Sequence, residues 1–250
     1  FKTHQLVIMP QQVCYYDFPI FQFASSKQFV INKLSAGAKA VVLAHPRVKN
    51  GYSDKDLKKL NGYNLMEILN HAGNACNKWD VALSAGKPVW IVGDDDTHDV
   101  HDSNQTFENW TMIDCREQNK DSLINNLVSG DAYAVNGKNA FNGNRLIDVK
   151  VDSMNIVMQL QNKADSIQLI GQNGIERKVS YNTNTIDYTF FKNDTYIRAV
   201  AYNKTSSMYF NPIIRYDGNK QPENILTATI NFSDTILFRS SLKISWLILL

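Results

Sequence analysis

The residues with the clearest chemical potential are a carboxylate and an imidazole two positions apart. Asp96 and His98 follow the apolar run 89–92, which predicts a short buried strand. In an extended backbone, side chains two positions apart point to the same side, so Asp96 and His98 would face one point. Carboxylate oxygens and imidazole nitrogens are ligands for divalent metals. The alternative is a polar loop in which an aspartate caps the next helix, because short motifs often match by chance.

Similar side chains follow two other predicted strands. His45 ends the apolar run 40–44, and Asn70 follows the run 65–69. Because the strand ends of a parallel βα array lie on one face, these residues would meet the carboxylate–imidazole pair. Arg47 is placed to face an anionic substrate. The alternatives are a histidine bonded to backbone, a strand cap and an exposed surface arginine.

Up to about Gly137, strand and helix patterns alternate. The expected strands are 6–9, 15–23, 40–44, 65–69, 89–92, 111–115 and 132–135, and the expected helices are 27–36, 79–84 and 120–129. This alternation predicts a parallel sheet or barrel. After Lys138 the chain consists of short β-rich runs separated by Asn, Gly and Ser, which predicts an antiparallel sandwich. The expected fold class is therefore α/β plus all-β.

The sequence pattern changes near residue 138, from alternating strands and helices to short β-rich runs, and the chain ends in an apolar tail. We expect an α/β domain at 1–138, a β-sandwich at 139–233 and a tail at 234–250. The tail is shorter than the roughly 20 residues that a spanning helix needs. It is either a last strand or the first part of a membrane helix. The run that starts at Trp246 favours the membrane anchor, and with it a membrane-associated location.

Composition excludes several classes of protein. The chain has 250 residues, of which 44% are hydrophobic and 11% aromatic, so it can bury a large core and is not a disordered chain. Its net charge is +2, with scattered lysines and arginines, which gives no electrostatic case for nucleic acid. The three cysteines, Cys14, Cys76 and Cys115, match neither a zinc ribbon nor a C-x-x-C motif.

Several motifs in this order resemble one known family. They are Ala40-Val-Val-Leu-Ala-His-Pro46, Asn70 after a strand, Trp79-Asp80, Gly86-x-x-Val89-Trp90 leading into Asp95-Asp-Thr-His98, Gly130-x-x-Tyr133, Tyr196-Ile-Arg198 and Asn211-Pro-Ile213. Together they resemble the PHP (polymerase and histidinol phosphatase) family, in the branch of metallohydrolases related to carbamate hydrolase. The resemblance covers most of the chain and includes the β-domain that often follows PHP domains in bacterial members.

The resemblance implies a distorted βα barrel with a cluster of divalent metals and metal-assisted hydrolysis, often of phosphoesters. His45 matches the histidine of the family's A-H-P motif, and Asp96 and His98 match its final D-x-H pair, which implies that all three are metal ligands. Zn, Mn or Fe would suit these donors. Asp95 could orient a ligating histidine through its second ring nitrogen. The implied substrate is a phosphoester or another small molecule, with Arg47 and Asn70 as candidate contacts.

The chain also departs from the family pattern. The H-x-H and T-D-H-like motifs with which the family begins have no match here, and Gln11 or Gln12 stands where the family has a glutamate. An amide cannot supply the negative charge of a bridging carboxylate. We therefore expect a barrel that lacks its first βα units. The leading hypothesis is a metal-dependent hydrolase, degenerate or truncated, and the alternative is an inactive PHP-like binding protein with the sandwich as its recognition module.

Overall fold

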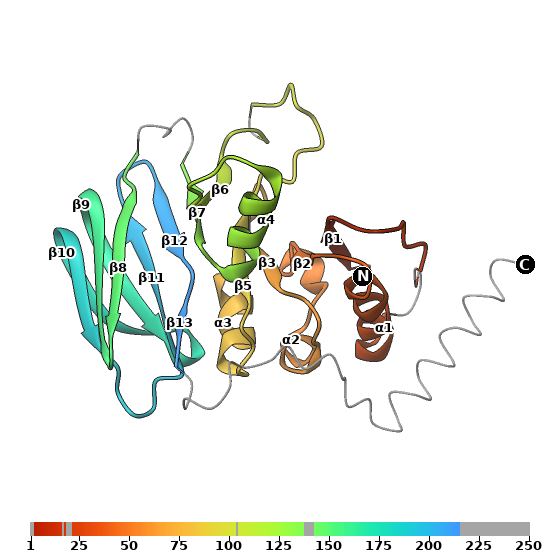
Figure 1. Ribbon diagram of the computed structural model, residues 1–250, viewed down its shortest axis with the longest axis horizontal. Coiled ribbons are helices and arrows are strands. Elements are labelled where there is room, and N and C mark those ends of the chain that lie inside the picture. Colours follow the sequence, from red (N-terminus) through yellow and green to blue (C-terminus); the bar gives the residue numbers. More distant parts are fainter. Residues whose placement is uncertain (1–2, 17, 19–21, 104, 138–142, 216–250) are drawn as a thin grey trace, which may run out of the picture.

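The computed structural model describes residues 3–16, 18, 22–103, 105–137 and 143–215. In this part of the chain the fold is mixed α/β, with more strand than helix, and its strands form two curled sheets. The curled antiparallel sheet occupies one end of the molecule and the first helix the other (Figure 1).

The smaller sheet has five strands and carries the predicted strand ends. Its strands are β1 (His4–Ile8), β2 (Ala40–Ala44), β3 (Leu65–Asn70), β4 (Gly73–Asn74) and β5 (Trp90–Gly93). Strands β2, β3 and β5 are parallel, which confirms the prediction for the centre of this sheet. Strand β1 runs antiparallel to β2, so the prediction of an all-parallel arrangement is wrong at this edge.

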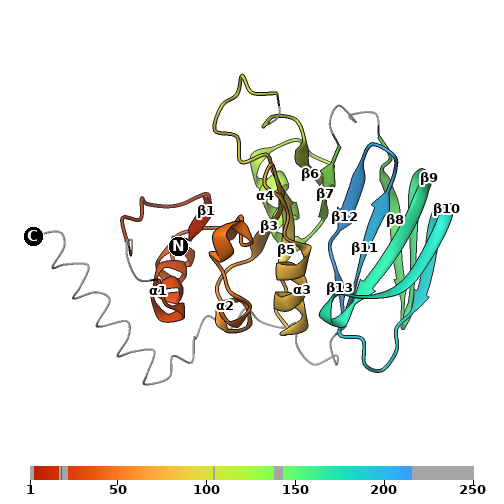
Figure 2. The same cartoon turned by 180° about the vertical axis from the view of Figure 1, so that it is seen from behind.

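Helices cover both faces of this sheet because its strands are apolar on both sides. The helices are α1 (Ala24–Ser35), the 3₁₀ turn η1 (Val48–Asn50), α2 (Asp54–Lys59), α3 (Cys76–Ser84) and α4 (Lys120–Ser129). Val41 and Leu43 belong to the core that α1, α2 and α3 cover, whereas Val42 belongs to a smaller core with Leu127 of α4. Seen from behind, α3 stands between α2 and the curled sheet (Figure 2). The strand expected at 15–23 is wrong: the described residues of this range, 15–16, 18 and 22–23, form no strand, and α1 begins at Ala24.

The larger sheet is antiparallel and has eight strands. They are β6 (Asn109–Ile113), β7 (Ala132–Asn136), β8 (Leu146–Asp152), β9 (Asn155–Gly171), β10 (Ile175–Thr189), β11 (Tyr196–Tyr202), β12 (Ser207–Phe210) and β13 (Ile213–Ile214). The 3₁₀ turn η2 (Gln172–Gly174) joins β9 to β10, as the Gly-rich sequence there predicts. The sheet encloses a second core, to which β7, β9, β10, β11 and β12 contribute.

Strands β6 and β7 correct the predicted topology. They were expected to extend a parallel sheet, but they pair antiparallel with each other, and β7 pairs with β12 of the larger sheet. The larger sheet therefore contains strands from both sides of the predicted boundary at 138. Gly93 of β5 packs so closely on this sheet that a Cβ there would lie 2.8 Å from the Cβ of Ala134.

Buried polar side chains join helix α3, which covers the five-stranded sheet, to the larger sheet. Arg198 of β11 donates from Nε and Nη2 to the two carboxylate oxygens of Asp80 on α3, both at 2.7 Å, and the hydroxyl of Tyr196 donates to Asp80 at 2.9 Å. All three side chains are buried. The Arg198 guanidinium also lies 5.4 Å from the ring centre of Trp79.

A second fastening comes from Asn211, between β12 and β13. Its Oδ1 accepts from the backbone N–H of Ile91 at 2.8 Å, and its Nδ2 donates to the carbonyls of Gly130 and Ala132. One side chain thus joins the edge of β5 to the start of β7.

The predicted apolar tail, 234–250, lies outside the described residues. Within the described part of the chain, none of the helices combines the length and the apolar character that crossing a membrane requires.

Replacing the buried arginine should be costly. Arg198→Met leaves the Asp80 carboxylate buried without its cation, and we expect the free energy of unfolding in urea to fall by about 3–5 kcal/mol. The matched control is Lys178→Met, because Lys178 pairs with Asp187 at 3.0 Å on the exposed side of β10. That change should cost less than about 1 kcal/mol. Equal losses in the two variants would show that the Asp80–Arg198 pair does not hold the two parts together.

Candidate functional site

A pocket of about 280 Å³ opens at the carboxyl ends of β2 and β3. Its walls include His45, Arg47, Lys49, Glu67 and Asn70. Three residues predicted from the sequence, His45, Arg47 and Asn70, therefore share one pocket. The parallel arrangement of β2 and β3 brings them together, because it places both carboxyl ends at the same edge of the sheet.

Glu67 is the centre of this pocket and was not predicted. It lies within β3 and is 2% exposed. One carboxylate oxygen accepts from the backbone N–H of His45 at 3.0 Å, and the other accepts from Nδ2 of Asn70 at 2.5 Å. The amide oxygen of Asn70 accepts from the backbone N–H of Ala72 at 2.9 Å. Asn70 is thus engaged at both ends of its amide and positions Glu67 and the loop after β3.

Two aspartates that follow β5 act on Glu67 electrostatically. Burial, and next the negative charge of Asp94, raise the pKa of Glu67 to about 7, and Asp96 adds to this effect. Burial also raises the pKa of Asp94, and the negative charge of Asp96 raises it further. The backbone N–H of Asp96 donates to Asp94 at 2.9 Å, and this contact works in the opposite direction. Three carboxylates therefore repel one another in a partly dry site, and a divalent cation would relieve that repulsion.

His71 and His98 present ring nitrogens suited to a metal. Nδ1 of His71 lies 2.8 Å from the carbonyl oxygen of Asp95, and Nδ1 of His98 lies 2.8 Å from that of Asp96. A carbonyl oxygen only accepts, so Nδ1 must carry the hydrogen and Nε2 keeps its lone pair in the neutral ring. The two ring centres are 6.0 Å apart. His71 was not predicted, although its position directly after a buried strand was a usable signal.

A second pair of histidines lies beside the pocket. Nδ1 of His4 is 2.9 Å from Nε2 of His45, so one of the two nitrogens carries the hydrogen and the other accepts. The pairing of β1 with β2 produces this contact, because His4 is the register partner of Ala44.

Two of the three predicted metal ligands have unusual backbone conformations. His45 has φ of 30° and Asp96 has φ of 47°, in the left-handed region that residues other than glycine seldom adopt. Such conformations cost about 1–3 kcal/mol and cluster at functional sites. His45 directly follows β2 and lines the pocket, and Asp96 lies in the loop three residues after the end of β5.

Some expectations fail in detail. Asp95 does not orient a histidine ring through its carboxylate, which accepts instead from the backbone N–H groups of residues 107–109. The backbone N–H of Gln11 donates to the carbonyl of Gly37, which precedes the start of β2. Gln11 therefore lies at the opposite end of β2 from His45, which follows the end of this strand. Among the described residues, no three His, Cys, Asp or Glu side chains are arranged around a common point as metal ligands would be. His45, Asp96 and His98 therefore share a region but do not converge on one atom.

Comparisons of the chain with protein-family models, with curated proteins and with solved structures give no match.

The raised pKa of Glu67 predicts a pH dependence of stability. The folded protein holds this proton up to about pH 7, whereas the unfolded chain releases it near pH 4.5. The contribution of Glu67 is therefore fully present below pH 4.5 and is lost as pH rises through 7, by an amount on the order of 3 kcal/mol. Glu67→Gln should abolish this part of the fall when urea unfolding is measured in chelator from pH 4.5 to 8.

The matched control for this measurement is Glu176→Gln, an exposed position on β10. It should keep the pH dependence of the parent protein. If Glu67→Gln and the parent protein lose the same stability between pH 4.5 and 7, Glu67 does not titrate in this range.

Proposed function

We propose that the chain is a metal-dependent hydrolase of the PHP type that acts on phosphoester substrates. The observation that carries the proposal is the gathering of imidazole and carboxylate groups at the carboxyl ends of three parallel strands. His45 follows β2, Glu67 lies within β3, His71 follows β3, and Asp96 follows β5. Strand ends of this kind are where α/β enzymes place their chemistry.

The proposed metal ligands are His45, Asp96 and His98, with His71 as an addition. Imidazole nitrogens with lone pairs and mutually repelling carboxylates fit Zn, Mn or Fe in chemical kind. A bound divalent metal would supply Lewis-acid chemistry for hydrolysis. Since the described donors do not surround one point, side chains of the exposed loop that carries His98 would have to rotate toward His45.

The rest of the pocket suits an anionic substrate. Arg47 and Lys49 line it and are exposed. One guanidinium nitrogen of Arg47 donates to the carbonyl of Asn74 at 3.1 Å, which orients the group across the pocket. A planar guanidinium can bind two phosphate oxygens at once, and Lys49 adds a second positive charge. In this proposal Glu67, with its pKa near 7, holds or releases a proton beside the substrate.

The proposed function also assigns each of the two sheets to a domain type. We interpret the five-stranded sheet as part of a PHP-type barrel and the curled sheet as the following β-sandwich. The parallel run of β2, β3 and β5 supports the first interpretation. The core that β9, β10, β11 and β12 enclose supports the second.

A second candidate function is a catalytically inactive PHP-like binding protein. Gln11 and Gln12 stand where the resemblance implies a bridging glutamate, and Gln11 lies at the opposite end of the sheet from His45. A pocket with positive residues at its rim would then bind an anion without turning it over.

Metal titration tests the proposal. We expect Mn²⁺ or Zn²⁺ to bind the parent protein in calorimetry, and His45→Ala, Asp96→Asn and His98→Ala each to weaken binding at least tenfold, since each removes a ligand. His101→Ala is the matched control, because His101 lies in the same exposed loop as His98 and is not a proposed ligand, and it should bind metal like the parent. Hydrolysis of bis(p-nitrophenyl) phosphate should follow the metal affinities.

The outcomes separate the two candidates. Metal binding with hydrolysis supports the enzyme, and loss of both in the His45, Asp96 and His98 variants locates its site. Metal binding without hydrolysis of a phosphoester panel favours the inactive binding protein. A protein that binds no transition metal contradicts the metal-dependent hydrolase.

A further inference from the structure

A larger cavity, of about 410 Å³, lies on the other side of the His4–His45 pair. It lies between the N-terminal segment and α1, and its volume is within the range of about 300–1,000 Å³ that is common for small-molecule sites. One part of its lining, the polar wall, contains Gln22, Ser26 and Lys27, and another part, the aromatic wall, contains Tyr15, Tyr16 and Phe18. None of the residues discussed as metal ligands lines it.

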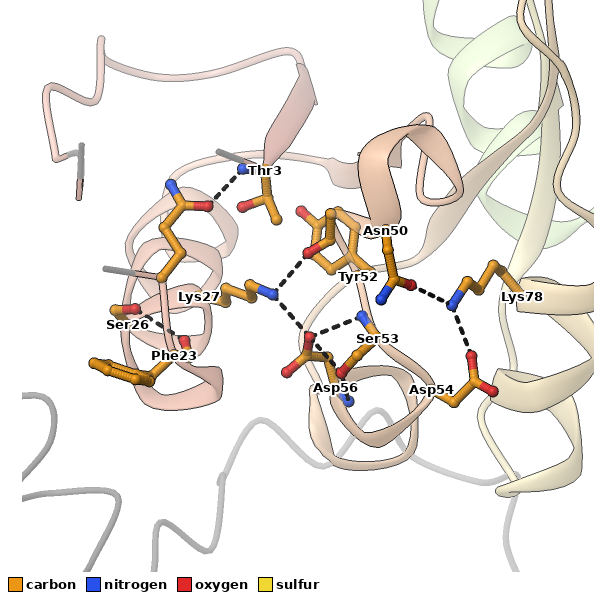
Figure 3. Close-up of polar contacts among 12 residues, drawn as sticks. Thr3, Phe23, Ser26, Lys27, Asn50, Tyr52, Ser53, Asp54, Asp56 and Lys78 are labelled. Carbon is orange, nitrogen blue, oxygen red and sulfur yellow. Dashed lines mark hydrogen bonds and ion pairs between the residues drawn. The ribbon is translucent and has the colours of Figure 1, made fainter. Parts of the chain in front are cut away.

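The polar wall carries a buried ammonium group. Lys27 is 7% exposed, and its Nζ donates to the carbonyl of Gly51 and to Oδ2 of Asp56, both at 2.7 Å (Figure 3). The same Nζ lies 5.5 Å from the ring centre of Tyr52. Because Lys27 also lines the cavity, a ligand there that brings an oxygen acceptor would lie beside a buried positive charge.

The negative partner of Lys27 is directed away from the cavity. Asp56 does not line it, and its Oδ2 also accepts from the backbone N–H and the hydroxyl of Ser53, which caps α2 (Figure 3). Lys27 therefore lines the cavity, whereas its carboxylate partner does not. Lys33 adds positive charge at the aromatic wall, because its Nζ lies 5.5 Å from the ring centre of Tyr16. None of the described lining residues is acidic.

The aromatic wall suits a flat apolar group. Tyr16 and Phe18 both pack edge-on against Phe29 of α1, with ring centres 5.3 and 6.0 Å apart. These contacts hold the two rings in place, and Tyr15 extends the wall toward solvent, where it is exposed. Aromatic ligands pack well against rings fixed in this way.

We propose that this cavity is a binding site for a small organic acid with an aromatic body, whose carboxylate accepts from Lys27 and whose ring packs on Tyr16 and Phe18. The site needs no metal and stands independently of the proposed hydrolase function.

Calorimetry with two matched probes tests the proposal in the presence of chelator. 3-Phenylpropanoate should bind the full chain with a dissociation constant on the order of 1 mM or lower. 3-Phenylpropanamide has the same shape without the charge and should bind at least tenfold more weakly. No heat of binding for the acid, or equal affinity for acid and amide, would overturn the proposal.

A variant that adds a negative charge locates the site. Gln22→Glu keeps an acceptor for the backbone N–H of Thr3 and places a negative charge on the polar wall. It should weaken binding of the acid at least tenfold, with far-UV circular dichroism and thermal midpoint showing that the protein is folded. The control is Gln159→Glu, which adds the same charge at an exposed position of β9 and should change nothing. Unchanged affinity in a folded Gln22→Glu protein would contradict the assignment.

Discussion

The buried ion pair between Asp80 and Arg198 is the interaction on which the arrangement of the molecule depends. It joins α3 to β11, and α3 begins at Cys76, directly after the loop that lines the pocket at the ends of β2 and β3. Removing two charges from water is costly, so the pair stabilises this arrangement only while both partners remain in contact. The turn before β10 packs closely against the same carboxylate, because a Cβ at Gly174 would lie 2.8 Å from an oxygen of Asp80.

The pocket that this framework supports is electrostatically unfavourable by itself. Glu67 is buried beside Asp94 and Asp96, and His45 and Asp96 adopt strained backbone conformations. The buried carboxylates and the strained backbone both lower the stability of the folded protein. Unfavourable features of this kind are typical of sites organised around a ligand. In the proposed function, a divalent cation would relieve the repulsion of the carboxylates, and the carbonyl contacts of His71 and His98 leave Nε2 of each ring as the possible ligand.

Local features of the fold could be predicted from the sequence because local interactions decide them. Helix α4 was predicted with the bounds it has, since Asn119 caps its start and Gly130 adopts the left-handed conformation at its end. Strand pairing could not be predicted in the same way. The antiparallel pairing of β1 with β2, and the membership of β6 and β7 in the larger sheet, depend on contacts with distant residues.

The residues of the candidate site also differ in whether local sequence could locate them. His45 was located at the pocket because the residue that ends a buried parallel strand has a known place. Glu67 was overlooked because it lies inside an apolar run, although a charged residue in a buried strand was itself a signal. The contact of His4 with His45 required knowledge of the register between β1 and β2.

The central claim is that the ends of β2, β3 and β5 form one metal site, and anomalous diffraction from crystals grown with Mn²⁺ tests it most directly. We predict a manganese peak bonded to His45 and to at least one of Asp96 and His98, with Glu67 or His71 beside it. Manganese bound elsewhere on the chain, with no peak at these residues under saturating metal, would contradict the claim.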